Sequence, residues 1–308
     1  MTPIGSPVVH IGWMNPGTAY LDHLTEADLS ILGGAFDGPE VEGDASEYLR
    51  SHPEIVEEAL GSPAAFERVL GAPVGDELLV HASPFLVFAV AVHHTVDELG
   101  HTNFVEERVT PRMRVPVFDA GQLREFGVDP ARRYFLVEHL ASYTRVMSGP
   151  VWVERRGRWR RQRFSELDAA RLAATLDAVP ESDRPGIYRR LGDLALFLTG
   201  VFPDHSVART VHPIELERLL RSLHSTDVPA PKLHDVEELA GERGVAGLLE
   251  WLGPRWYHEA AERTPVTGLS RLLDDLATRF DQARRFLNHL TDRYLFPVRS
   301  RWFPATGG

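Results

Sequence analysis

An unbroken heptad pattern near the C-terminus is the feature that most constrains how this chain can fold. Eight apolar side chains follow at alternating spacings of four and three residues: Leu269, Leu273, Leu276, Phe280, Ala283, Leu287, Leu290 and Tyr294. Such spacing places apolar groups along one side of an α-helix. The pattern therefore predicts a long helix over 269–295 that packs lengthwise, either in the core of a helical bundle or in a dimeric coiled coil.

Three earlier helices are predicted to begin with the same device, a side-chain acceptor directly before a proline. These dipeptides are Ser62-Pro63, Ser83-Pro84 and Asp129-Pro130. Proline suits the first helical position, and the residue before it can cap the free backbone N–H groups of the first turn. The helix after Ser83 is apolar on every face for two turns, so we expect it to run through the middle of the molecule.

One segment departs from helical periodicity. Residues 151–164 alternate apolar side chains around Arg156-Gly157, which is typical of a β-hairpin. Ser165, with Asp168 three residues later, predicts a capped helix directly after it. The predicted fold class is therefore mainly α: a multi-helix domain with a long packed C-terminal helix and one small β-hairpin.

Length and composition agree with a globular domain. The chain has 308 residues, of which 43% are hydrophobic and 25% charged, and this balance supports a sizeable core. It has no cysteine, which excludes disulfides, thiolate zinc sites and a cysteine nucleophile. We predict a single helical domain over 1–308. As an alternative, a proline-rich segment near 225–232 separates an N-terminal lobe, 1–224 with the hairpin, from a C-terminal lobe, 233–308.

Targeting signals are not found. The first basic residue is Arg50, and no apolar stretch opens the chain, whereas a secretory signal needs both features. The longest apolar run, Phe85 to Val92, has eight residues, and a membrane span needs roughly 20. We therefore predict a cytoplasmic protein with no membrane partner.

The acidic net charge of −11 is unevenly distributed. Residues 1–110 hold 3 basic side chains and 18 carboxylates, whereas residues 111–308 hold 30 basic and 26 acidic side chains. The hairpin alone carries six arginines between Arg155 and Arg163. An acidic protein is a poor candidate for nucleic-acid binding. We expect the hairpin to dock on the acidic N-terminal part, within one chain or in a homo-oligomer, or to contact a separate protein partner.

Common catalytic motifs are absent from the sequence. It contains no Gly-rich phosphate loop, no GxSxG nucleophile elbow, no HExxH and no zinc-finger spacing. Catalytic residues therefore cannot be assigned from motifs, and no organic cofactor is indicated.

One dense cluster of ligand-type side chains lies in HHTVDELGH, residues 93–101. At 100° per residue, His94, Glu98 and His101 fall within about 60° of each other, and Asp97 extends the same side. Glu98 and His101 form the Glu-x-x-His pair that carboxylate-bridged di-iron bundles use. The candidate metal ligands are thus these four residues, and their donors suit iron or another divalent transition metal such as manganese or zinc.

This cluster also has an ordinary interpretation. The apolar stripe of the same helix lies on the opposite side, so the cluster can be the solvent-exposed face of an amphipathic helix. No second Glu-x-x-His pair accompanies it. Two functions stay open: a helical metalloprotein, such as an iron-dependent oxidase, or a non-enzymatic interaction or regulatory protein that acts through charged surfaces and the heptad helix.

Asp193 is a second place where a polar group precedes a wholly apolar run. A carboxylate directly before a buried helical segment needs a positively charged partner, and we expect Arg189, one turn earlier, to be that partner. The functional alternative makes Asp193 and His205 site residues. His289 lies three positions off the heptad seam and is expected on the outside of its helix.

Overall fold

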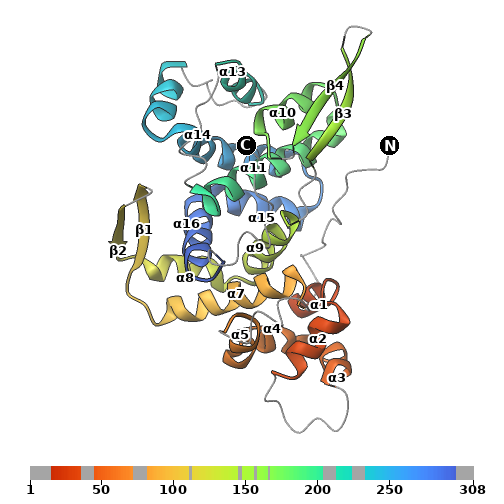
Figure 1. Ribbon diagram of the computed structural model, residues 1–308, viewed down its shortest axis with the longest axis vertical. Coiled ribbons are helices and arrows are strands. Elements are labelled where there is room, and N and C mark those ends of the chain that lie inside the picture. Colours follow the sequence, from red (N-terminus) through yellow and green to blue (C-terminus); the bar gives the residue numbers. More distant parts are fainter. Residues whose placement is uncertain are drawn as a thin grey trace.

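The computed structural model describes residues 15–35, 45–71, 82–110, 113–144, 148–155, 158–165, 167–203, 213–223 and 233–295. The first half contains α1 (Pro16–Leu21), α2 (Glu26–Gly33), α3 (Ala45–Ser51), η1 (Pro53–Ile55), α4 (Val56–Gly61), α5 (Pro63–Leu70), α7 (Pro84–Gly100), β1 (Val105–Thr110), β2 (Met113–Val117), α8 (Ala120–Val128) and α9 (Pro130–Ser142). The second half contains β3 (Ser148–Arg155), β4 (Arg158–Ser165), α10 (Ala169–Ala173), η2 (Ala174–Asp177), η3 (Glu181–Asp183), α11 (Arg184–Gly200), α13 (Pro213–Arg221), α14 (Leu233–Arg263), α15 (Thr267–Thr278), α16 (Phe280–Leu290) and η4 (Thr291–Leu295). The mainly α fold class is confirmed (Figure 1).

Helix α7 lies inside the molecule, as its sequence predicts. Every residue from Leu86 to Val92 is fully buried. The helix contacts α4 and α5 on one side and α8 and α9 on the other, and Figure 1 shows it between these two groups of helices. A helix that is apolar on all faces is thus packed against other helices on all faces.

The N-caps predicted at Ser62, Ser83 and Asp129 are confirmed. The side chains of Ser62, Ser83 and Asp129 accept backbone hydrogen bonds of 3.0–3.2 Å from the first turns of α5, α7 and α9. Farther along, Asp168 rather than Ser165 caps the helix after the hairpin, because Ser165 is the last residue of β4. Capping is a local interaction, which is why sequence spacing predicts it well.

The heptad segment is buried, but it forms two helices rather than one. The backbone leaves helical geometry at Arg279, between α15 and α16. On either side of this break the seam packs on different partners: α15 lies on α14, and α16 lies mainly on α11 and α8. Seam residues such as Leu276 and Leu287 are fully buried within a single chain. Of the two predicted packings, these contacts are those of a bundle core.

Helix α14 contains two residues that regular helices usually lack, and the backbone leaves helical geometry at the first of them, Gly244. Gly244 has a φ of 60°, a conformation that glycine adopts without steric cost, and the regular helix resumes at residue 245. Pro254 lies inside the helix and has no N–H for the carbonyl of Glu250. The preceding Gly253 allows close contact, since a Cβ there would lie 2.4 Å from Phe280.

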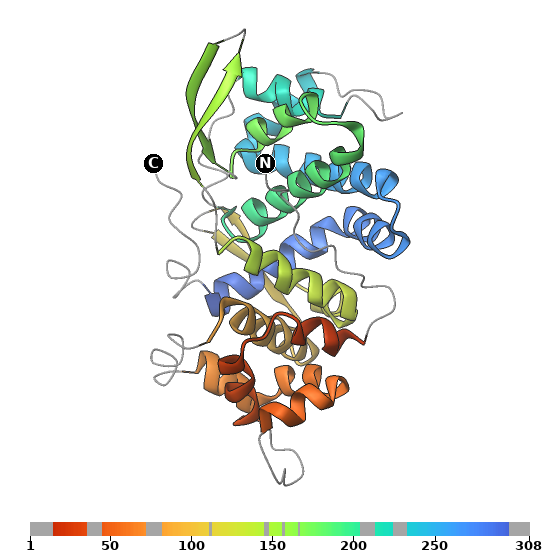
Figure 2. The same ribbon diagram turned by 90° about the vertical axis from the view of Figure 1, so that its right-hand side faces the viewer.

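Two separate two-stranded sheets accompany the helices. The predicted hairpin is confirmed as β3–β4, antiparallel, with pairing from Ser148–Ser165 to Arg155–Arg158. The second hairpin, β1–β2, was not predicted; its register shifts between Arg108 and Thr110. Figure 1 shows both hairpins at the edge of the helical body, and Figure 2 shows β3–β4 there again.

Buried side chains from almost every described helix form one hydrophobic cluster that extends along the chain from Ala19 to Leu295. The predicted lobe boundary at 225–232 lies outside the described residues. Among the described residues, no helix combines the length and the hydropathy that a membrane span requires.

Candidate functional site

The four predicted metal ligands separate into two pairs. Asp97 and His101 are mostly exposed, with ring nitrogen and carboxylate 3.9 Å apart. His94 and Glu98 turn instead toward the C-terminal segment, where both contact Tyr294. Within the described parts of the chain, no group of three or more His, Cys, Asp or Glu side chains is placed to hold a metal ion.

Glu98 is the centre of a polar junction between α7, α16 and η4. It accepts a hydrogen bond from the Tyr294 hydroxyl, and the Arg293 Nε lies 2.8 Å from its other oxygen. His289 Nε2 is 3.6 Å away, so this histidine faces inward and not outward as predicted. Burial acts to raise the pKa of Glu98, but the nearby His289 ring, the hydrogen bond from Tyr294 and the charge of Arg293 hold the pKa below its ordinary value. The carboxylate is therefore an ionised anchor.

His94 is held by aromatic rings rather than by charges. Its ring stacks on Phe66 with centroids 3.5 Å apart, and it meets the Tyr294 ring edge-on at 5.3 Å. Burial lowers the pKa of His94. Its neighbour His93 is almost fully buried, and a ring nitrogen lies 3.2 Å from the Tyr20 hydroxyl. Both histidines thus join α7 to other helices.

Asp193 is buried and paired, as the structural interpretation of the sequence predicts. Its carboxylate accepts a 2.8 Å hydrogen bond from the Tyr257 hydroxyl and lies 3.8 Å from Arg189 Nε. Arg189 also contacts Glu138 on α9 at 3.4 Å. The cluster links α9, α11 and α14 across the core. His205, the other residue of the functional alternative, lies outside the described residues.

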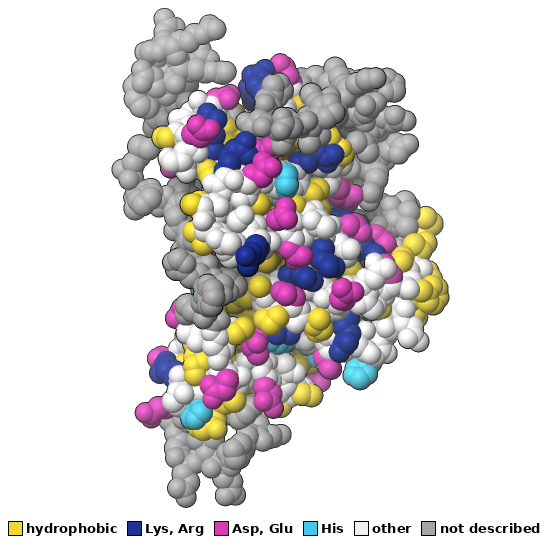
Figure 3. All heavy atoms as spheres, turned by 180° about the vertical axis from the view of Figure 1, so that it is seen from behind, with side chains coloured by type: hydrophobic (Ala, Val, Ile, Leu, Met, Phe, Trp, Pro, Cys, Tyr) yellow, Lys and Arg dark blue, Asp and Glu magenta, His cyan; other side chains and the backbone are white. Residues whose placement is uncertain are grey.

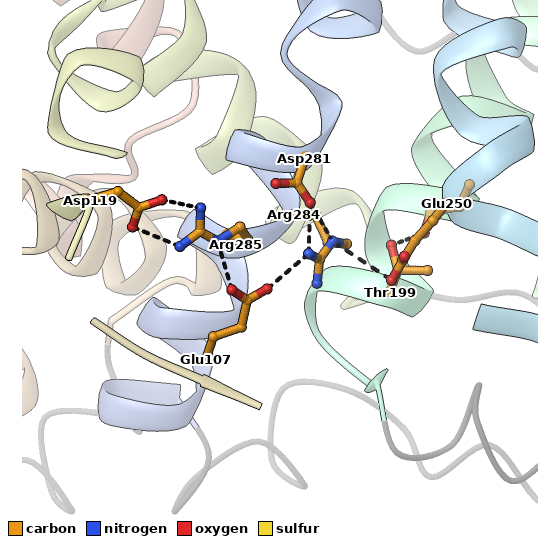
Figure 4. A network of polar contacts seen from close by, with 8 residues as sticks. Glu107, Asp119, Thr199, Glu250, Asp281, Arg284 and Arg285 are labelled. Carbon is orange, nitrogen blue, oxygen red and sulfur yellow. Dashed lines mark hydrogen bonds and ion pairs between the residues drawn. The ribbon is translucent and has the colours of Figure 1, made fainter. Parts of the chain in front are cut away.

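A second charge network, which the sequence did not indicate, surrounds two adjacent arginines of α16 (Figure 4). Arg284 is 7% exposed and lies 2.7 Å from Asp281, 3.2 Å from Glu107 and 3.7 Å from Glu250. Burial acts to lower the pKa of the Arg284 guanidinium, but the carboxylates of Glu250 and Asp281 outweigh it and raise the pKa. The network joins β1, α14 and α16.

Arg285 extends this network toward the loop after β2. It donates a 2.7 Å hydrogen bond to Asp119, and its Nε lies 3.3 Å from Glu107. The hydrogen bond from Arg285 holds the pKa of Asp119 below its usual value. Glu107 therefore bridges both arginines, and the β1–β2 hairpin is tied to the core by charge-assisted hydrogen bonds.

Comparison with known protein families, with curated proteins and with solved structures gives no match for this chain. We therefore infer the function from the molecule's own surfaces and clusters.

Exposed apolar side chains gather around the β1–β2 hairpin. Phe118 is 78% exposed, and its ring lies 5.8 Å from that of Phe104. Met113, the first residue of β2, is also exposed. Figure 3 shows hydrophobic side chains at the edge of the molecule where these strands lie. Exposed aromatic groups of this kind are enriched at protein–protein interfaces.

Proposed function

We propose that this protein is a non-enzymatic interaction protein that docks an acidic protein surface through the arginine-rich β3–β4 hairpin. The observation that carries the proposal is the hairpin itself: two eight-residue strands paired along their whole length, at the edge of a helical body (Figure 1). Residues 155–163 include six arginines in a chain of net charge −11. Arginine suits this role because its planar guanidinium binds carboxylates through two parallel hydrogen bonds.

The hairpin's position bears on which surface it can reach. Among the described helices, α1 to α5 form an acidic end, with eight carboxylates and two arginines in residues 15–35 and 45–71. Figures 1 and 2 show the β3–β4 hairpin at the opposite end of the molecule from these helices. In this structure, the hairpin therefore does not dock onto the acidic end of its own chain. The hairpin's partner is then another molecule, either a separate protein or a second copy.

The polar contacts of the helical body also support the proposal. Three of its polar clusters are held by internal contacts: Glu98 binds Tyr294, Asp193 binds Tyr257, and Arg284 binds three carboxylates. Such paired groups stabilise a scaffold rather than present a reactive centre. The exposed Phe104 and Phe118, which flank strands β1 and β2, would add an apolar contact to the charged one.

The test is charge reversal on the hairpin. We expect self-association in sedimentation, or binding to a glutamate-rich polypeptide, to be lost in the triple variant Arg158→Glu, Arg160→Glu, Arg161→Glu. Raising the salt concentration should weaken the same interaction, because it screens exposed charges. A matched control reverses three exposed arginines on the helices, Arg124, Arg221 and Arg271, and should keep the interaction.

Two outcomes would overturn the proposal. One is a parent protein that neither self-associates nor binds the acidic polypeptide. The other is tight, salt-sensitive binding of a nucleic acid, with the acidic polypeptide unable to compete.

The alternative function, a metalloprotein with iron or another divalent ion at His94, Asp97, Glu98 and His101, has less support in the geometry. Elemental analysis of protein purified without an affinity tag tests it directly. Stoichiometric metal that is lost in His101→Ala and Glu98→Ala, and kept in a control at the exposed His258, would favour the metalloprotein. His289 is unsuitable as a control because it contacts Glu98.

A further inference from the structure

One side of the β1–β2 hairpin faces away from the helical body. Successive residues of a strand point to opposite sides of a sheet. Val105 is buried and Glu107 contacts Arg284, so one side of the hairpin lies on the helices. The alternate residues, together with those that flank the strands, are exposed and form what we call the outer face: Phe104, Glu106, Arg114, Pro116 and Phe118.

The outer face carries an exposed pair of aromatic rings. Among the described residues, four large apolar side chains are exposed, and Phe104, Met113 and Phe118 of these belong to the hairpin or flank it. The rings of Phe104 and Phe118 have centroids 5.8 Å apart, and Phe118 is 78% exposed. Figure 3 shows apolar side chains at this edge of the molecule. Contiguous exposed apolar groups of this kind mark protein–protein contacts.

The exposed charges of the outer face are one of each sign. Arg114 lies 3.8 Å from Glu106, and it is also held by Asp292 of η4 at 3.1 Å. A partner surface of a single sign would be attracted by one group of the Glu106–Arg114 pair and repelled by the other. A second copy related by a two-fold axis can instead place its Glu106 against Arg114 and its Arg114 against Glu106. The face is therefore complementary to itself.

Strand addition along β2 is a less suitable way to cover this hairpin. Pro116 lies within β2 and has no N–H to donate to a further strand. Proline is one of the residues by which edge strands avoid such pairing. The contact expected here is thus between side chains of the outer face. The hydrogen bond of Glu107 to Arg284 fixes the hairpin on the body, so the face is ordered before any contact forms.

We propose that the outer face is the contact between two copies of the chain in a two-fold dimer. The rings of Phe104 and Phe118 of the two copies pack together, and the Glu106–Arg114 pairs lie at the rim. Because each copy has a net charge of −11, a locally neutral, apolar face is where two copies can approach. The dimer does not use the β3–β4 hairpin. It presents two copies of that hairpin, which allows bivalent docking on an acidic partner.

The first test is sedimentation of the full chain at about 0.5 M salt, where the Debye length is only about 4 Å. Association that salt removes belongs to the β3–β4 hairpin, and association that persists belongs to the outer face. We expect a dimer with a Kd of about 10–100 µM, since few side chains take part. Phe104→Ser and Phe118→Ser should each raise this Kd about tenfold, with the fold checked by circular dichroism melting. The triple variant Arg158→Glu, Arg160→Glu, Arg161→Glu should dimerise like the parent.

The second test uses the two-fold charge pairing, at the same salt concentration. Arg114→Glu and Glu106→Arg each place like charges opposite one another in the dimer and should each raise the Kd severalfold. An equimolar mixture of these two variants again places opposite charges at both pairs, so it should associate about as tightly as the parent. Pairs that become partly buried are screened less than exposed ones. The matched controls, Arg221→Glu and Glu217→Arg in the exposed ion pair of α13, should leave the Kd unchanged.

Three outcomes would overturn the proposal. The first is a parent that stays monomeric at about 200 µM, which would leave the outer face to another protein. The second is a Phe118→Ser variant that dimerises as well as the parent. The third is a mixture of Arg114→Glu and Glu106→Arg that associates no better than either variant alone. These outcomes do not depend on the β3–β4 hairpin, whose own test is binding of the glutamate-rich polypeptide.

Discussion

His139 is a wholly buried imidazole in an aromatic surrounding. Its ring lies near those of Phe135, Tyr143 and Phe197, at centroid distances of 5.4–6.2 Å. Within the described part of the chain, neither ring nitrogen has a hydrogen-bond partner. Burial lowers the pKa of His139 to about 4, because the protonated ring would lose its hydration without a compensating contact; Asp193 acts against this shift, and Arg190 and Arg189 reinforce it.

The first prediction is that His139 makes the fold sensitive to acid. Its pKa is lower in the folded chain than the ordinary 6.5, so the unfolded chain binds more protons between these values and stability falls as the pH falls below about 6.5. This one group should cost about 2 kcal/mol of stability by pH 5. His139→Phe should remove that loss, and denaturant unfolding at pH 7 and pH 5 measures it.

A control distinguishes His139 from the other histidines. His93 is also buried, and burial lowers its pKa to about 3, so His139→Phe should remove only part of the total acid sensitivity. Phe135→Leu changes a neighbour of the His139 ring without removing a titratable group, and it should keep the parent's pH dependence. Equal pH dependence in the parent and in His139→Phe would show that the buried ring is not a source of acid instability.

At the residue scale, the sequence predicts pairs within one helix and not pairs between helices. Arg189 and Asp193 are four residues apart, so their contact follows from helical geometry. Glu98 and Tyr294 are 196 residues apart, and nothing in their spacing indicates the contact. The Arg284 network had one overlooked signal: Arg284 directly follows the seam residue Ala283, so it lies at the edge of the buried face.

At the scale of helices, α14 packs closely against the α15–α16 break because residue 253 is a glycine and has no side chain. The second prediction is that Gly253→Ala destabilises the fold by about 1–3 kcal/mol, because the new Cβ would lie 2.4 Å from Phe280 and 3.0 Å from the Ala195 Cβ. Thermal and denaturant unfolding measure the change.

Two other helical glycines provide the control for this variant. A Cβ at Gly121 or at Gly186 meets nothing within 4 Å. Gly121→Ala and Gly186→Ala should therefore stabilise by about 0.5 kcal/mol, through the reduced freedom of the unfolded chain. If Gly253→Ala behaves like these two, then Phe280 moves aside at little cost and the packing argument is wrong.

The third prediction concerns the seam itself. Leu276 and Leu287 lie on either side of the break, and both are fully buried. Leu276→Asp and Leu287→Asp should each destabilise the fold by several kcal/mol, since an unpaired carboxylate would replace a packed side chain. Thr278→Asp, on the exposed side of α15, is the control and should melt close to the parent. A parent-like melt of either leucine variant would contradict the burial of the seam.

The sequence predicted element types better than element limits. Caps and periodicity are local, so α5, α7, α9 and the β3–β4 hairpin were predicted near their positions. The β1–β2 hairpin was missed because Glu106, Glu107 and Arg108 interrupt the apolar alternation of its first strand. The break at Arg279 was missed because the heptad pattern runs through it and only the change of packing partner, from α14 to α11, reveals it.

For the whole molecule, the open question from the sequence is whether the chain unfolds as one unit or as two lobes. The described core forms one hydrophobic cluster from Ala19 to Leu295, and the α16 segment packs on α7, α8, α11 and α14. A helix that contacts elements from both proposed lobes couples their stabilities. Because the coupling depends on long-range packing, the proline-rich segment alone cannot show whether the chain unfolds as one unit or as two lobes.

The last prediction is therefore a single cooperative unfolding transition. In scanning calorimetry, the measured enthalpy should equal the van't Hoff enthalpy, which is the test of two-state behaviour. Leu276→Asp should shift the whole transition to lower temperature. It should also lower the hydrogen-exchange protection of the distant helix α4, because that helix packs on α7 in the same cluster. Glu217→Gln, an exposed change in α13, should leave both unchanged. Independent lobes predict the opposite pattern: two transitions, with Leu276→Asp lowering one of them while α4 keeps its protection to the parent's temperature.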